Sequence, residues 1–185
     1  MMIHQLQASF SVEHDRILVR MNTQSAEELR LWLTRRIVKK LLPHLVKATT
    51  RLVNAQAQLA SHDGADANAL AQFRKQETLQ QADFKTPFDA QAATLPIGSE
   101  PLLATVVHIT SGDNGVLRIG FVEKIPHVAE SRSFEVTLEL ALLHGFLHLI
   151  ETALHHADWD ITPGGVEPLR QTDAFAAIEP PRYMN

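Results

Sequence analysis

Cysteine is absent from this 185-residue chain, and aromatic residues are scarce, with two Trp, one Tyr and eight Phe. The lack of cysteine excludes disulfides, a thiolate nucleophile, and zinc or iron–sulfur sites with cysteine ligands. A metal site in this protein would have to use His, Asp or Glu. Folding needs neither a disulfide nor a metal, because a chain of this length buries roughly two thirds of its extended surface.

Long apolar runs are also missing. The most apolar stretch, residues 138–154, is interrupted by Glu139, His144, His148 and Glu151, so it is a poor candidate for a membrane span. The first residues, Met-Met-Ile-His-Gln-Leu-Gln, have neither the basic lead nor the apolar core of a signal peptide. We therefore expect a cytoplasmic protein with no membrane partner.

The motifs of several enzyme classes are lacking as well. The chain contains no phosphate-binding loop, no Gly-x-Ser-x-Gly nucleophile elbow and no Rossmann glycine pattern. No catalytic residue can be named from the sequence. An enzyme is therefore the less favoured hypothesis.

Hydrophobic alternation predicts three short strands at the start of the chain, at residues 3–12, 16–22 and 28–33. The short connections between them favour an antiparallel meander. At Thr34 the period changes, and an apolar stripe at helical spacing continues to about residue 61. Thr34 is suited to cap this helix, because its hydroxyl can accept a hydrogen bond from a first-turn amide. Asp66 could cap a second, weaker helix that ends near Ala82.

The second half of the chain repeats this plan. Residues 103–110 and 116–122 flank a Ser-Gly-Asp-Asn-Gly turn and predict a β-hairpin. Residues 133–139 alternate again and run directly into a helical pattern at 140–157. The alternative interpretation is a single helix from Ser133 onward.

Together these patterns predict an α+β fold: an antiparallel sheet of five or six strands in two sets, covered by a long amphipathic helix and a shorter C-terminal helix. We expect one domain at residues 1–157. The remaining residues, 158–185, contain four of the nine prolines and two glycines. They predict a tail that is loosely packed or disordered.

Four side chains that can bind metals share one face of the C-terminal helix, at spacings of four, three and four residues: His144, His148, Glu151 and His155. Such groups can hold zinc, nickel or iron. However, Gly145 occupies the position where a zinc-protease helix carries its catalytic Glu. The four residues also span about 16 Å, so only neighbours among them could share one metal. A polar helix edge is the favoured interpretation, and a transition-metal site is the alternative.

The long helix is basic on one side. Between residues 34 and 61 there are six basic residues and no acidic one: Arg35, Arg36, Lys39, Lys40, Lys47 and Arg51. The rest of the chain has 11 basic against 21 acidic residues, although the overall net charge is only −4. These cations fall opposite the apolar stripe, where they could contact phosphates or an acidic protein surface. No aromatic residue shares that side to stack on bases, and a solvated helix face is the simpler interpretation.

The sequence leaves three functional hypotheses. The first is a non-enzymatic binding or assembly protein, a homo-oligomer or the partner of another protein, because opposite charges separated in one chain favour association. The second is a metal-binding protein or metal-dependent enzyme that uses the histidine stripe. The third is binding of a polyanion such as nucleic acid by the basic helix.

Overall fold

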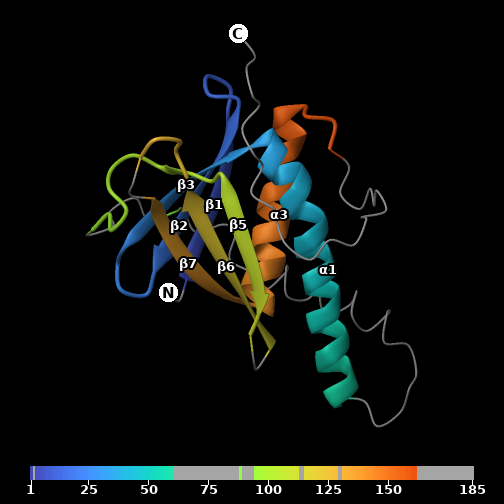
Figure 1. The fold of residues 1–185 in the computed structure, drawn as a ribbon. Coiled ribbons are helices and arrows are strands. Elements are labelled where there is room, and N and C mark those ends of the chain that lie inside the picture. The colour runs from blue at the N-terminus through green and yellow to red at the C-terminus, as the bar shows by residue number, and fades with distance from the viewer. Residues whose placement is uncertain (2, 61–87, 89–93, 113–114, 129–130, 162–185) are drawn as a thin grey trace.

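The structure, a computed structural model, describes residues 1, 3–60, 88, 94–112, 115–128 and 131–161. Within these residues seven strands form two sheets, and two helices follow the third and the last strand (Figure 1). In chain order the elements are β1 (Ile3–Ser11), β2 (Arg16–Thr23), β3 (Glu28–Thr34), α1 (Arg35–Ala60), β4 (Leu102–Leu103), β5 (Val106–Ser111), β6 (Val116–Glu123), β7 (Arg132–Glu139) and α3 (Leu140–Ala157).

The α+β class is confirmed, but the prediction of one sheet with five or six strands is wrong. β1, β2 and β3 form an antiparallel meander, which β4 extends as a fourth strand parallel to β3. β5, β6 and β7 form a separate antiparallel sheet of three strands. The two sheets meet beside β7, where the Thr137 amide donates a hydrogen bond to the Met1 carbonyl at 3.1 Å.

The sheets divide at a point that hydrophobic alternation could not reveal. The Ala104 amide donates to the Trp32 carbonyl of β3 at 3.1 Å, whereas the next amide, Thr105, donates to the Val122 carbonyl of β6 at 2.9 Å. The extended segment predicted at 103–110 therefore leaves one sheet and enters the other between two consecutive residues. Alternation shows that a segment is extended, but not which strand it pairs with.

The two halves of the chain share the plan of three strands and a helix. In the first half, Arg16 at the start of β2 pairs with Thr34, and α1 begins at the next residue. In the second half, Val116 at the start of β6 pairs with Glu139, and α3 begins at the next residue. Each helix thus follows directly from the third strand of its meander.

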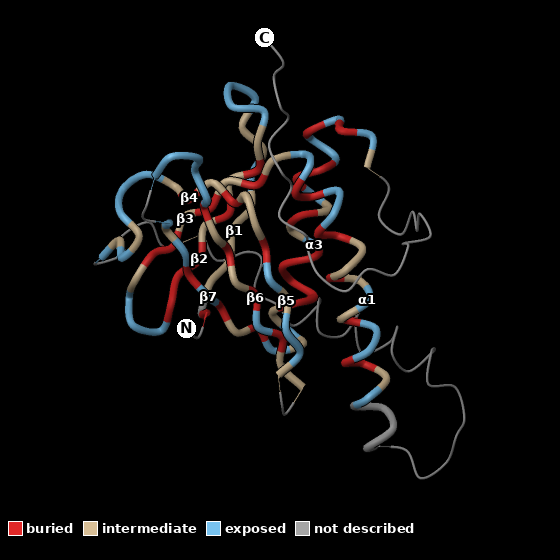
Figure 2. Tube along the Cα trace, in the orientation of Figure 1, coloured by how far each residue is buried: buried red, intermediate tan, exposed pale blue. Residues whose placement is uncertain are grey.

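α3 lies between the sheets and α1 (Figure 1). Its buried residues are therefore spread widely around the helix: Leu143, His144, Gly145, Phe146, Leu147, Ile150, Ala153, Leu154 and Ala157. The inward side chains of the sheets complete the core, including Ile17, Leu31, Ile119 and Phe121, all with no exposed surface. Figure 2 shows this buried layer running through the strands and α3.

The predicted helix boundaries hold in both halves. The Ile37 amide donates to the Thr34 hydroxyl at 3.3 Å, which confirms Thr34 as the N-cap of α1. α1 continues through Pro43. β7 ends at Glu139 and α3 begins at Leu140, so the alternative of one helix from Ser133 is wrong.

α3 ends where Asp158 adopts the left-handed conformation with a φ of 49°. Trp159 then turns into the core with 3% of its surface exposed. Its indole N–H donates to the Asp15 carboxylate at 2.7 Å, and its ring meets Phe10 edge-on with centroids 5.6 Å apart. The helix predicted at 66–82 and most of the predicted tail, residues 162–185, lie outside the described residues. Neither described helix combines the length and apolarity needed to cross a bilayer.

Candidate binding surfaces

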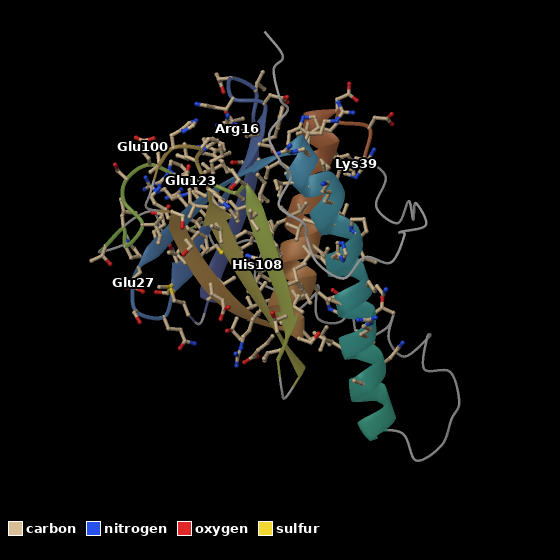
Figure 3. All side chains as sticks on the ribbon, viewed as in Figure 1. Arg16, Glu27, Lys39, Glu100, His108 and Glu123 are labelled. Atoms are coloured by element: carbon tan, nitrogen blue, oxygen red, sulfur yellow. The ribbon has the colours of Figure 1, made fainter. Side chains whose placement is uncertain are left out.

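The basic face of α1 is exposed at both ends of a strip along the helix, within residues 35–40 and at Lys47 and Arg51. All six predicted basic residues are exposed, and none of their side chains forms a hydrogen bond or ion pair with the described part of the chain: Arg35, Arg36, Lys39, Lys40, Lys47 and Arg51. They alternate with the buried stripe that includes Leu41, Leu42 and Leu45, so packing of that stripe turns them outward. Lys39 extends from α1 on the side away from the sheets (Figure 3). From Arg35 to Arg51 the strip is about 24 Å long.

The structure separates the four candidate metal ligands of α3. His144 is 2% exposed, whereas His148 and His155 are exposed and Glu151 is half-buried. In the described ranges no three His, Asp or Glu side chains come together in a way that could hold a metal ion. Spacing predicted that these four side chains share one face of α3. The packing of α1 and the sheets covers this face at His144, so the four side chains do not form one exposed surface.

The outer face of the four-stranded sheet carries a polar cluster that the sequence analysis did not identify. On β2 the buried side chains of Ile17, Val19 and Met21 alternate with outward ones, among them Arg20. The register places Arg20 opposite Arg30, with Glu28 two residues before Arg30. Both arginines bind the same carboxylate oxygen of Glu28, at 2.5 Å and 2.9 Å.

Glu28 is buried in this cluster, with 1% of its side chain exposed. Burial raises the pKa of Glu28, but hydrogen bonds from Arg20 and Arg30 outweigh that effect and lower the pKa below its ordinary value. The same contact raises the pKa of Arg30. Arg20 also lies over the ring of Phe88, 4.4 Å from its centroid, which is a cation–π contact.

A second buried carboxylate belongs to the other sheet. Glu123, at the end of β6, pairs with Arg132 and accepts a hydrogen bond from the Leu103 amide at 3.2 Å. Arg132 also donates to the carbonyls of Ile97 and Glu100, at 3.3 Å and 3.1 Å. This pair holds the segment that leads into β4 against the end of β6.

An apolar row crosses the outer face of the four-stranded sheet beside the Arg20–Glu28–Arg30 cluster. Trp32 lies between its pairing partners Leu18 and Leu103, and all three side chains are half-buried. The ring of His14, from the β1–β2 turn, stacks on Trp32 with centroids 4.9 Å apart and planes at 29°. The row offers both aromatic and aliphatic surface on a face that otherwise carries polar and charged groups.

One signal in the sequence pointed to this face. In the segment 28–33, Leu29, Leu31 and Leu33 occupy the core side, so alternation places Glu28, Arg30 and Trp32 together on the other side. Alternation could not identify the residues of the neighbouring strand, because the pairings with Arg20 and Leu18 depend on strand register. The stacking of His14 depends on the geometry of the turn.

Comparisons of the chain with protein-family models, with curated proteins and with solved structures gave no match.

Proposed function

We propose that this chain is a non-enzymatic binding protein that assembles with copies of itself, and that the basic face of α1 is the contact surface. The observation that supports this is a strip of six exposed cations with no ionic partner in the described part of the chain.

The rest of the chain supplies the opposite charge, with 21 acidic against 11 basic residues. Exposed carboxylates lie, for example, on β7 at Glu135 and Glu139. A two-fold dimer would form the contact between α1 and an acidic surface twice, which makes a closed and self-complementary assembly. Complementary charges of this kind favour a particular orientation and speed association more than they add affinity.

The experiment measures the mass of the full chain by light scattering. Lys40→Glu with Lys47→Glu should shift the protein toward the 20.6 kDa monomer, and added salt should shift the wild type in the same direction. The matched control reverses Arg118 and Lys124, which are exposed elsewhere and give the same change in net charge. A wild type that is already monomeric, or a mass unaltered by the α1 reversals, contradicts the proposal.

A second candidate function is binding of a polyanion by the same face. The observation in its favour is the strip's length of about 24 Å with no acidic residue within it. Retention on heparin should then fall steeply with salt, and it should fall further for the α1 reversals than for the matched control. Equal retention of both variants would exclude this function. No observation favours the metal hypothesis, since the described residues bring no ligand set together.

A further inference from the structure

The junction between β3 and α1 gathers aromatic and basic side chains from four parts of the chain. Trp32 lies near the end of β3, and His14 reaches it from the β1–β2 turn. Arg16 begins β2 opposite Thr34, the residue that precedes Arg35 of α1. We name these four side chains, His14, Arg16, Trp32 and Arg35, the junction patch.

The aromatic part of the junction patch is open on one side. His14 is exposed although its ring stacks on Trp32 at 4.9 Å between centroids. Its Nδ1 lies 2.9 Å from the Ser11 hydroxyl, which fixes the ring in place. A flat ring added on the far side of His14 would extend the stack to three rings. The patch therefore supplies the aromatic platform that the basic face of α1 itself lacks.

Two arginines beside this platform could contact an anion. The side chains of Arg16 and Arg35 form no hydrogen bond or ion pair within the described residues, so both remain available to a ligand. Two carboxylates lie in the same turn; each accepts a hydrogen bond from a neutral donor and keeps its negative charge. Asp15 accepts the indole N–H of Trp159, and Glu13 accepts a hydrogen bond from the Ser11 hydroxyl at 3.0 Å.

We propose that the junction patch binds single-stranded nucleic acid, with a base stacked on His14 and adjacent phosphates on Arg16 and Arg35. Aromatic side chains that stack on bases, next to cations that follow the backbone, are the combination by which proteins bind single strands without reading sequence. A duplex is disfavoured because its bases are already stacked on one another. The patch shares Arg35 with the basic face of α1, but its stacking platform lies on the β1–β2 turn and β3, so the proposal does not depend on self-assembly.

The test is fluorescence anisotropy of a labelled oligothymidylate of about 15 nucleotides, titrated with the full chain at about 50 mM salt. The wild type should bind it more tightly than a duplex of equal length. His14→Ala should weaken binding about 5- to 100-fold, the range expected for loss of one stacked base. Arg16→Ala should reduce the slope of log affinity against log salt by about 0.7, since one phosphate contact is lost. Glu13→Gln should tighten binding, because it removes a negative charge beside the platform.

Matched controls come from the other sheet. His108→Ala and Arg118→Ala remove the same residue types from exposed positions on β5 and β6 and should leave binding unchanged. Trp32→Phe keeps a ring under His14 and should weaken binding less than His14→Ala. Failure of the wild type to bind, equal affinity of His14→Ala, or a duplex bound as tightly as the single strand would each overturn the proposal. Because assembly is read from mass and this site from anisotropy, failure of one is distinguishable from failure of the other.

Discussion

In both halves of the molecule three strands are followed by a helix, but the first helix lies at the surface and the second in the interior. α1 buries one apolar stripe and leaves six cations exposed along the other side. α3 contains no lysine or arginine and buries residues around much of its circumference, because it lies between the sheets and α1. The same order of strands and helix therefore gives an outer helix in the first half and a central one in the second.

The sheets of the two halves differ in a corresponding way. The outer face of the four-stranded sheet carries an apolar row, a stacked His14–Trp32 pair and a buried carboxylate held by two arginines. The outer face of the three-stranded sheet carries small and polar positions, among them Gly120 between His108 and Glu135. Both halves contribute to the core, and they differ in what they expose on the outer faces of their sheets.

The largest expected effect on stability comes from removing the Trp159 side chain, which connects the two halves of the chain. Trp159→Ala should lower the free energy of unfolding by about 3–5 kcal/mol, because it removes a buried aromatic side chain that packs on the β1–β2 hairpin. Trp32→Ala removes the same side chain from a half-buried position and should cost clearly less. Urea denaturation of both variants checks the difference. Equal losses would mean that the core does not depend on the Trp159 contact.

A smaller effect is expected at the carboxylate of the first half. Glu28→Ala should cost about 3 kcal/mol at neutral pH, because Arg20 and Arg30 lose their common partner. The pKa of Glu28 is lowered by folding, so its contribution is present above its unfolded value near 4.5 and is lost as the pH falls through the lower folded value.

The stability difference between wild type and Glu28→Gln should therefore shrink in acid. Urea denaturation at neutral pH and at about pH 3 measures it. Glu123→Gln, which removes the charge of the buried carboxylate paired with Arg132, serves as the comparison from the second half. If wild type and Glu28→Gln differ in stability by the same amount at both pH values, the charge of Glu28 does not stabilise the fold.

The smallest effect concerns the central helix and has the opposite sign. Gly145 is buried in α3, but a Cβ built there meets no atom within 4 Å. Gly145→Ala should therefore raise the free energy of unfolding by about 1 kcal/mol through its better helix propensity alone. Ala141→Gly, at an exposed position of the same helix, should lower it by a similar amount. Thermal denaturation of the pair tests this, and destabilisation by Gly145→Ala would show that the space is not available.

Much of the fold was predictable because its elements alternate cleanly between periods of two and 3.6. The Thr34 cap, the β7–α3 boundary and the repeated plan all follow from local pattern. The division into two sheets did not, because it depends on where the Ala104 and Thr105 amides find their acceptors. Such partners lie far away in sequence, and no local pattern encodes them.

For the candidate surfaces as well, local pattern predicted only the contacts within one element. The basic face of α1 was predictable, since helical spacing alone places its cations opposite a buried stripe. The junction patch was not, because His14, Arg16 and Trp32 meet only through strand register and the shape of a turn. In the histidine stripe, helical spacing did not show that neighbouring elements cover His144 and leave His148 and His155 exposed.

The hydrogen bond between Trp159 and Asp15 also bears on how the chain reaches this fold. It joins residues 144 positions apart, and β1 packs along α3, so many core contacts are distant in sequence. Such a topology folds slowly compared with a helical bundle. At roughly 5–20 residues per second on the ribosome, Asp15 is made about 7–30 s before Trp159. During that interval the apolar face of the first meander lacks α3, the helix that packs on β1 and β2 in the folded chain.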